Sequence, residues 1–172
     1  MKRTLELPYE EKKLLEIRKG DEVTLSGVLY VGRDMVHKRL YDAIRFSQPL
    51  PFQFESNGIY YMGPSPKKGS FPFGAAGPTT SARMDPFSPL LIENGLRLMI
   101  GKGPRDRSVI SSIKEHKGLY LQAIGGCGAL YASCIKKAEV VAYSSLGPEA
   151  LMKIEVEDFP TLCIIDSEGE VL

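Results

Sequence analysis

Hydrophobic and polar positions follow two periods along the chain, and each period predicts one kind of element. In residues 33–46, RDMVHKRLYDAIRF, apolar positions recur every three or four residues, which predicts the clearest helix. The face that these positions share holds Val36, His37, Leu40, Tyr41 and Ile44. The run EVTLSGVLYVG at 22–32 is rich in Val, Leu and Tyr and predicts a strand, with Gly27 as a candidate break.

Shorter patterns predict the remaining elements. Strands are predicted over residues 3–7, 58–63, 97–102, 119–125, 139–143 and 160–166. Helical segments are predicted over residues 10–17, 82–94, 105–118 and 127–138, with Val109, Ile110 and Ile113 facing inward in the third. From residue 97 onward strands and helices alternate with short links. This alternation predicts parallel or mixed strand pairing, with helices on the faces of the sheet.

Length and composition fit one soluble globular domain, since 43% of the 172 residues are hydrophobic and 25% are charged. The half of the chain before residue 97 is richer in strands and loops. We therefore expect an α/β fold: a single domain over residues 1–172 with a mixed sheet and a strand-rich, partly barrel-like N-terminal half.

Charge, hydropathy and cysteine content argue against several classes of protein. The formal net charge of +1 disfavours a general nucleic-acid binder, which needs a basic excess. No apolar run approaches the roughly 18 residues of a membrane helix, and MKRTLELPYEEKK at the N-terminus lacks the apolar part of a secretory signal. We therefore expect a cytoplasmic protein. Cys127, Cys134 and Cys163 show no CxxC spacing, so neither a disulfide framework nor a metal site is expected.

Three stretches combine the end of a predicted strand with the start of a helix or loop. Arg33 follows the strand at 22–32, Thr79 to Arg83 open the next helical segment, and Lys102 ends the strand at 97–102. Ligands of α/β sheets collect at such junctions, where free backbone N–H groups and the helix dipole attract anions. Two arginines and a lysine add full positive charges. The combination predicts a site for a small dianion, such as a dicarboxylate or a phosphate.

Structural roles compete with this interpretation. Threonine or serine at a helix start is commonly a cap, although none of Thr79, Thr80 and Ser81 has the Glu or Gln three residues on that completes a capping box. Arg33 can equally be a solvated residue at a helix end. His37 lies on the apolar helix face, one turn after Arg33, so a core histidine bonded to a carbonyl and a site histidine are both open.

Other motifs fail when their spacing is checked. The segment GLRLMIGKG at 95–103 has five residues between its first two glycines, whereas a phosphate-binding P-loop has four and a Ser or Thr after the lysine. The turn GGCGAL at 125–130 lacks the third glycine of a dinucleotide-binding turn, which favours a tight turn with close helix packing. Cys127 lies near a helix start, but His116 is not placed as its base, so a cysteine hydrolase is disfavoured.

Several segments in order carry a family resemblance. They are GVLYVGRDMVHKRL, YYMGP, GPTTSARMD, LMIGKG and IEVEDFPTLCIIDSEG. Together they resemble the beta subunit of class I fumarate hydratase and of L-tartrate dehydratase over nearly the whole chain. The resemblance implies the swivelling β/β/α fold. It also implies a hydro-lyase, with reversible hydration of fumarate to malate as the expected reaction and dehydration of tartrate as the alternative.

The resemblance also implies roles for residues and partners. Thr79 matches the family's proposed proton-abstracting threonine, and His37 occupies the histidine position of its RDxxH motif. Arg33, Arg83 and Lys102 match the ligands of the substrate carboxylates. The family's oxygen-sensitive 4Fe-4S cluster belongs to a separate alpha subunit, where one iron acts as Lewis acid on the substrate. We therefore expect an alpha-subunit partner, a heteromer with it, and no cluster on this chain.

Two rival functions remain alongside the hydro-lyase subunit. One is a free-standing anion-binding module without catalysis, and the other is a self-sufficient cysteine enzyme that depends on Cys127. A Cys127 and Gly128 pair stands where the family often has an alanine-rich segment, a departure expected to affect packing more than the reaction.

Overall fold

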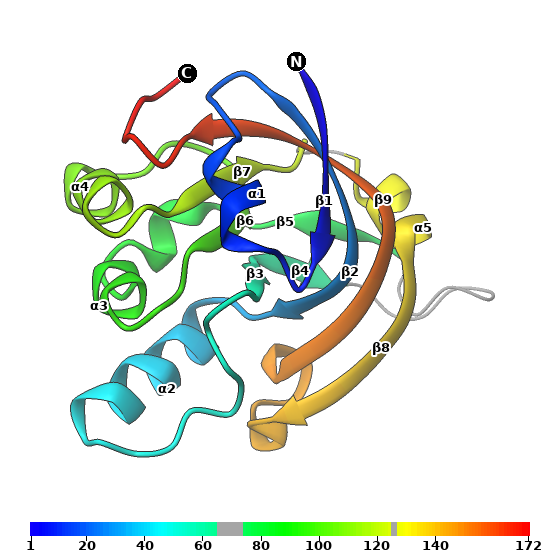
Figure 1. The fold of residues 1–172 in the computed structure, drawn as a ribbon. Helices are drawn as coiled ribbons and strands as arrows, with labels where there is room; N and C mark the ends of the chain where they lie inside the picture. The colour runs from blue at the N-terminus through cyan, green and yellow to red at the C-terminus, as the bar shows by residue number, and fades with distance from the viewer. Residues whose placement is uncertain (65–73, 125–126) are drawn as a thin grey trace.

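The computed structural model describes residues 1–64, 74–124 and 127–172, so the glycine pair of the predicted turn at 125–126 lies outside the described residues. One seven-stranded sheet dominates the fold, in the order β1-β2-β3-β6-β7-β9-β8 (Figure 1). Its strands are β1 (Lys2–Leu7), β2 (Glu22–Val31), β3 (Gly58–Tyr60), β6 (Leu98–Gly101), β7 (Leu119–Gln122), β8 (Ile135–Ala142) and β9 (Leu151–Ile165). A smaller antiparallel sheet pairs β4 (Met62–Pro64) with β5 (Ala76–Pro78).

The large sheet is mixed and closes on itself. Strands β1, β2, β3, β6 and β7 are parallel to their neighbours in this series. The long strand β9 runs antiparallel to β7, to β8 and to β2. Because β9 pairs with both β7 and β2, the strands β2, β3, β6, β7 and β9 form a ring. The predicted mixed sheet and strand-rich N-terminal half are confirmed, and β9 extends the barrel into the C-terminal half.

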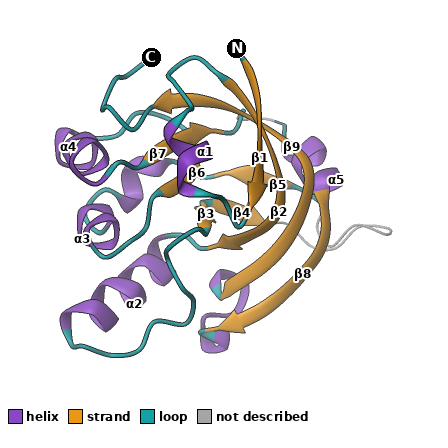
Figure 2. Ribbon diagram, in the orientation of Figure 1, coloured by secondary structure: helices purple, strands orange, loops and turns teal. Residues whose placement is uncertain are grey.

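Helices cover the sheet, and the alternation of side chains along each strand separates two cores. Figure 2 shows α2, α3 and α4 along one side of the strands, with α5 at the opposite side. The helices are α1 (Glu11–Leu15), α2 (Asp34–Arg45), α3 (Ser88–Glu93), α4 (Arg107–His116) and α5 (Gly128–Cys134). Leu98 and Ile100 of β6 face one core with α1 and α5, whereas Met99 between them faces α2, α3 and α4.

Two predicted helices are shorter than expected. The segment 82–94 splits into a 3₁₀ turn, η1 (Ser81–Met84), and the helix α3, with Pro86 between them. The segment 127–138 is helical only to Cys134, and residues 135–138 begin β8 instead. Ile135 is extended, fully buried and paired with Val156 of β9. Pairing with β9 and burial of Ile135 therefore outweigh the helical pattern of the sequence.

The glycine predicted as a break in the second strand is a β-bulge. The pairing of β2 with β9 shifts register between Leu25 and Gly27, whose φ is +118°. On the other edge of β2, a Cβ at Gly27 would lie 2.1 Å from the carbonyl oxygen of Leu7 in β1, so only glycine fits at this position. The strand continues through the bulge to Val31.

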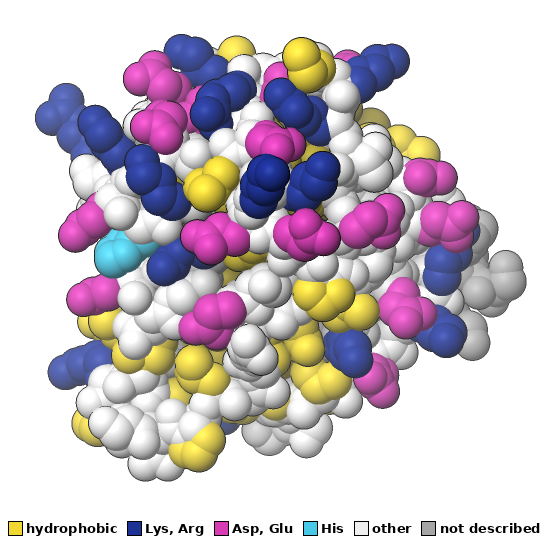
Figure 3. Space-filling model, viewed as in Figure 1, with side chains coloured by type: hydrophobic (Ala, Val, Ile, Leu, Met, Phe, Trp, Pro, Cys, Tyr) yellow, Lys and Arg dark blue, Asp and Glu magenta, His cyan; other side chains and the backbone are white. Residues whose placement is uncertain are grey.

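The surface of the face seen in Figure 3 mixes lysine and arginine with aspartate and glutamate. This agrees with the formal net charge of +1. Within the described ranges, none of the helices combines the length and the apolar character that crossing a membrane requires.

Candidate active site

The carboxyl ends of three neighbouring parallel strands form one edge of the sheet. The residues that follow β2, β3 and β6 remain hydrogen-bonded beyond the ends of the strands. The Gly32 N–H donates to the Tyr60 carbonyl at 3.2 Å, and the Tyr61 N–H donates to the Ile100 carbonyl at 2.9 Å. The chain therefore leaves all three strands side by side, in the position where α/β sheets collect ligands.

The segment with the two threonines lies along this edge. The Thr79 N–H donates to the Tyr61 carbonyl at 2.7 Å, and the Ser81 N–H donates to the Lys102 carbonyl at 2.9 Å. Thr80 and Lys102 form a parallel bridge. A Cβ on Gly101 would lie 2.0 Å from the Ser81 Oγ, so this close approach requires glycine there. The fold thus places Thr79 next to the end of β3 and Thr80 next to Lys102.

Arg33 reaches the same edge from the start of α2. Its Nη1 is 3.7 Å from where a Cβ on Gly63 would lie, and Gly63 pairs with Gly77, two residues before Thr79. The structure therefore brings Arg33, Thr79 and Lys102 to one edge of the sheet, although they come from segments far apart in the sequence.

Arg83 lies on η1, four residues after Thr79, and is exposed to solvent. Neither a hydrogen bond nor an ion pair joins its side chain to another residue in the described part of the chain. The structure places Arg83 near the threonine segment but does not by itself bring its guanidinium to Thr79. Thr80 stands at the N-cap of η1, and its side chain makes no capping hydrogen bond with any described residue.

The Arg33 guanidinium already holds a carboxylate. Its Nη2 is 2.9 Å from the Glu149 Oε1, and the two side chains are 28% and 31% exposed. Glu149 ends η2 (Ser144–Glu149), the turn between β8 and β9. The Arg33 Nε is buried and has no hydrogen-bond partner among the described residues. This arginine therefore occupies a place where a carboxylate can be bound.

His37 lies behind Arg33 in the core. Its side chain is fully buried, and its Nδ1 is 2.7 Å from the Arg33 carbonyl oxygen, to which the Nδ1–H donates. Burial lowers the pKa of His37 to about 4, so the imidazole is neutral near pH 7. Its Nε2 is unpaired within the described residues, and its ring stands edge-on to Tyr61 at 5.1 Å. This placement agrees with the core histidine bonded to a carbonyl.

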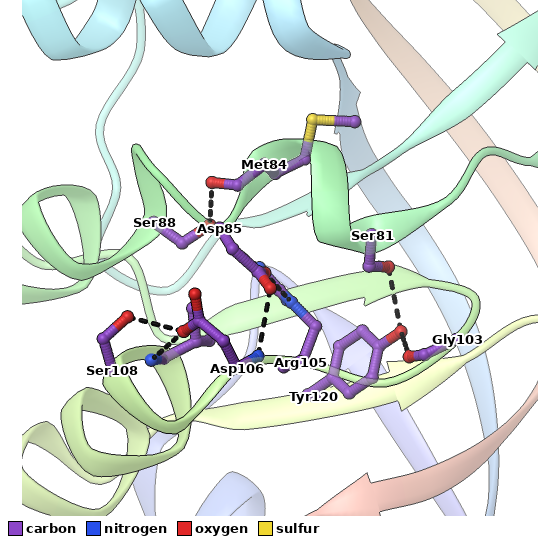
Figure 4. A network of polar contacts seen from close by, with 10 residues as sticks. Ser81, Met84, Asp85, Ser88, Gly103, Arg105, Asp106, Ser108 and Tyr120 are labelled. Atoms are coloured by element: carbon purple, nitrogen blue, oxygen red, sulfur yellow. Dashed lines mark hydrogen bonds and ion pairs between the residues drawn. The ribbon is translucent and has the colours of Figure 1, made fainter.

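Sequence reasoning missed a buried ion pair beneath the site (Figure 4). The Arg105 Nε donates to the Asp85 Oδ1 at 2.7 Å, and its Nη2 donates to the Ser88 Oγ at 2.9 Å. The Asp106 N–H donates to the other Asp85 oxygen at 3.0 Å. Both charged residues belong to segments at the predicted junctions, GPTTSARMD and GKGPRDR. Opposite charges in two segments that meet at one sheet edge are the signal that could have indicated the pair.

Aromatic side chains surround the same arginine. The Arg105 guanidinium carbon lies 5.3 Å from the Tyr61 ring centre and 4.9 Å from that of Tyr120. The Tyr120 hydroxyl is 2.8 Å from the Ser81 Oγ and donates to the Gly103 carbonyl at 2.7 Å. Burial alone lowers the pKa of Arg105, but Tyr61 and the Asp85 carboxylate more than offset this. The pKa is therefore raised, and the guanidinium stays charged.

The cysteines do not fit the ligand set of an iron–sulfur cluster. Cys134 and Cys163 are buried in the core, and burial raises the pKa of the Cys163 thiol to about 12. Cys127 stands at the N-cap of α5. Across residues 1–64, 74–124 and 127–172, no three His, Cys, Asp or Glu side chains come close enough together to hold a metal ion.

The comparisons with known proteins agree on one family. The family model described as Fumarase C-terminus matches residues 2–172. The chain is 42% identical over 149 residues to the anaerobic class I fumarate hydratase of Escherichia coli, covering 86% of this chain and 27% of that protein. It is 38% identical over 149 residues to the mitochondrial fumarate hydratase 1 of Leishmania major, again covering 86% and 27%.

A relative of similar length comes from Methanocaldococcus jannaschii. That protein carries the provisional name L(+)-tartrate dehydratase subunit beta and is 33% identical over 165 residues, which cover 92% of this chain and 85% of the relative. The chain thus spans only about a quarter of the two fumarate hydratases but most of the tartrate dehydratase subunit.

Proposed function

The chain belongs to the fumarase C-terminus family, and on this basis we propose that it supplies the cationic wall of a hydro-lyase active site. The reaction we assign first is the reversible addition of water to fumarate to give (S)-malate. The observation that carries the proposal is the meeting of Arg33, Thr79 and Lys102 at the carboxyl ends of β2, β3 and β6. A dicarboxylate is bound by cations, and Arg33 already binds a carboxylate there.

In this proposal the chain's residues bind the substrate and move one proton. In the dehydration direction, the malate proton next to a carboxylate is weakly acidic, and its removal places negative charge on that carboxylate. Arg33, Arg83 and Lys102 stabilise this charge, which lowers the barrier. Thr79 takes the proton, since surrounding cations favour the ionised form of its otherwise weakly acidic hydroxyl. A catalytic role of His37 stays a prediction. Its buried ring is hydrogen-bonded to the Arg33 carbonyl oxygen.

The site as proposed is completed by a second chain. We assign the 4Fe-4S cluster to an alpha-subunit partner, because the cysteines described above do not form its ligand set. When bound, the cluster supplies a Lewis acid for the substrate. The beta-subunit name of the M. jannaschii relative supports a partner of this kind. A cytoplasmic location and a heteromer of the two chains stay predictions.

L-tartrate dehydration is the second candidate reaction. It is favoured by the length match, because the aligned region covers 85% of the tartrate dehydratase subunit. The same cations fit tartrate, which is also a dicarboxylate, so the residues described here do not separate the two substrates.

Reconstitution tests these alternatives. The chain is mixed anaerobically with a cluster-loaded alpha subunit, and the hydration of fumarate and the dehydration of L-tartrate are assayed in the mixture and in each chain alone. We expect turnover only in the mixture. Tight dicarboxylate binding by this chain, without turnover in any mixture, would instead identify an anion-binding module. Turnover by this chain alone that is lost in Cys127→Ala would identify a cysteine enzyme.

A further inference from the structure

We propose that Asp85 and Arg105 are positioning residues, whose buried ion pair holds Thr79, Arg83 and Lys102 in the arrangement that acts on the substrate. The role in the reaction rests on the function proposed above. The role in holding the two segments together rests on the geometry alone, and the experiment below tests it separately.

The ion pair connects the two segments that carry the site. Asp85 follows Arg83 by two residues, on the chain that continues from Thr79 through η1. Arg105 follows Lys102 by three residues, in the loop between β6 and α4. The contact at 2.7 Å therefore fixes the end of one segment to the end of the other. The Ser81 N–H, which donates to the Lys102 carbonyl, joins their beginnings, so the two segments are held at both ends.

Both oxygens of Asp85 take part in this connection. One accepts from the Arg105 side chain, and the other accepts the Asp106 N–H at 3.0 Å. The carboxylate thus binds both the side chain and the backbone of the loop after Lys102. Tyr120 adds a second link, because its hydroxyl lies between the Ser81 Oγ and the Gly103 carbonyl oxygen. Figure 4 shows both links between the same two segments.

Because the ion pair is buried, stabilisation of the fold alone does not explain it. The Arg105 side chain is 0% exposed and that of Asp85 is 8% exposed. Removing both charges from water costs free energy, and this cost is absent for an apolar pair of similar volume. The Arg105 Nη1 is buried without a partner among the described residues, which adds to the cost. A contact that is expensive to bury, and that joins two segments of an active site, is explained by the geometry that it imposes.

The first test measures the arrangement without any assay of activity. Amide hydrogen exchange is followed by mass spectrometry in the full chain, in Arg105→Lys and in the double variant Asp85→Asn with Arg105→Gln. The lysine keeps the charge but lacks the planar fork that places Nε on Asp85 and Nη2 on Ser88. The double variant leaves no unpaired charge in the core. We expect faster exchange in residues 79–85 and 102–106 of both variants, with residues 119–122 of β7 unchanged. If residues 79–85 and 102–106 exchange at the wild-type rate in both variants, the proposal is overturned.

The second test measures the reaction in the complex with the alpha subunit. We expect kcat to fall roughly 10- to 100-fold in Arg105→Lys, because small misplacements of reacting groups have effects of this size. The double variant should regain stability relative to Asp85→Asn alone, while its kcat stays low. A double variant whose kcat recovers together with its stability would show that the pair is only structural.

Asp21→Asn is the matched control. Asp21 is also buried and paired with an arginine, with the Arg3 Nε at 3.0 Å, and it also accepts a backbone N–H, from Arg18. Its pair joins β1 to the loop before β2, away from the proposed site. We expect this variant to lose stability without a change in kcat or in the exchange of residues 79–85. If the wild-type complex lacks activity, the proposed function fails, while the exchange experiment still decides whether the pair holds the segments.

Discussion

The Arg33 guanidinium is bound by the Glu149 carboxylate, with Nη2 and Oε1 2.9 Å apart, and the two residues come from segments far apart in the sequence. Arg33 is the N-cap residue of α2, whereas Glu149 ends the turn between β8 and β9. In the proposed function Arg33 binds a substrate carboxylate. The Glu149 carboxylate is therefore a competitor for the same cation, supplied by the chain itself.

Glu149→Gln tests this competition. Loss of the negative charge frees the Arg33 guanidinium, so we expect a lower KM for the dicarboxylate. The pair is partly exposed and worth at most about 1 kcal/mol, which limits the decrease to roughly fivefold. Steady-state kinetics of the reconstituted complex measure the change, and Glu170→Gln, which removes an exposed partner of Lys19, is the control. An increase in KM would mean that Glu149 helps to hold Arg33 in its binding position.

Thr79→Ala removes the proposed base. We expect turnover to fall by at least about 100-fold, because general bases contribute effects of this size or larger. The complex with the alpha subunit should still form, as measured by size-exclusion chromatography. The neighbouring exposed threonine provides the control, and Thr80→Ala should stay within about twofold of the wild type. Turnover at the wild-type rate in Thr79→Ala would remove this residue from the mechanism.

Arg83→Ala tests the exposed arginine of η1. We expect mainly a higher KM, with a smaller decrease in kcat, because the side chain is proposed to bind a substrate carboxylate. The free energy of unfolding should change by less than about 0.5 kcal/mol, since the residue is on the surface. Arg107→Ala, an exposed arginine at the start of α4, is the control. If KM and kcat both match the wild type, Arg83 is not part of the site.

His37 predicts a pH dependence of stability. Its pKa is lowered from 6.5 to about 4 by burial, so between these values the unfolded chain binds a proton that the folded chain does not. Stability from this group is complete above about pH 6.5 and is lost as the pH falls towards 4. The difference corresponds to about 3 kcal/mol. The repulsion from Arg105 acts in the same direction as burial, whereas Asp34 and the bond to the Arg33 carbonyl act against it.

Urea unfolding between pH 7 and pH 4 measures this dependence. We expect His37→Asn to show a smaller decrease in the free energy of unfolding than the wild type over this range. His116→Asn replaces the other histidine, which lies at the end of α4, and should keep the wild-type decrease. Equal decreases in the wild type and in His37→Asn would show that His37 does not titrate in this way.

Elements with a strong local pattern could be predicted from the sequence. The helix α2 is predictable because apolar residues recur on one face and charged residues on the other over more than three turns. The strands β6 and β7 are predictable because they are short apolar runs. The first half of β9 was missed, although Ile154 and Val156 alternate with Lys153 and Glu155 in its sequence. This strand has one polar face, so its pattern is one of alternation and not of a continuous apolar run.

The placement of three candidate residues at one sheet edge could be predicted from the sequence, but the side chains that support them could not all be predicted. Arg33, Thr79 and Lys102 lie where predicted strands meet helices or loops, and the tendency of ligands to collect at such junctions is enough to group them. The partner of Arg33 could not be predicted in this way, whereas the opposite charges of Asp85 and Arg105 lie in two segments that were already placed at the same edge. Glu149 reaches Arg33 because η2, the turn between β8 and β9, packs against α2. Arg105 reaches Asp85 because the start of η1 is joined to Lys102 at the end of β6. Such contacts depend on the order of strands in the sheet, which a single sequence does not specify.

The closure of the sheet by β9 has a consequence for synthesis of the protein. Every residue proposed for the site precedes residue 106, yet β2 gains its antiparallel neighbour only from β9, which ends at Ile165. While translation is still upstream of β9, a nascent chain already contains all the cations and the threonine, but β2 and β7 each have an unpaired edge. The sheet that positions these residues is therefore closed only after the last strand has been made, and a chain that stops before β9 leaves two strand edges exposed.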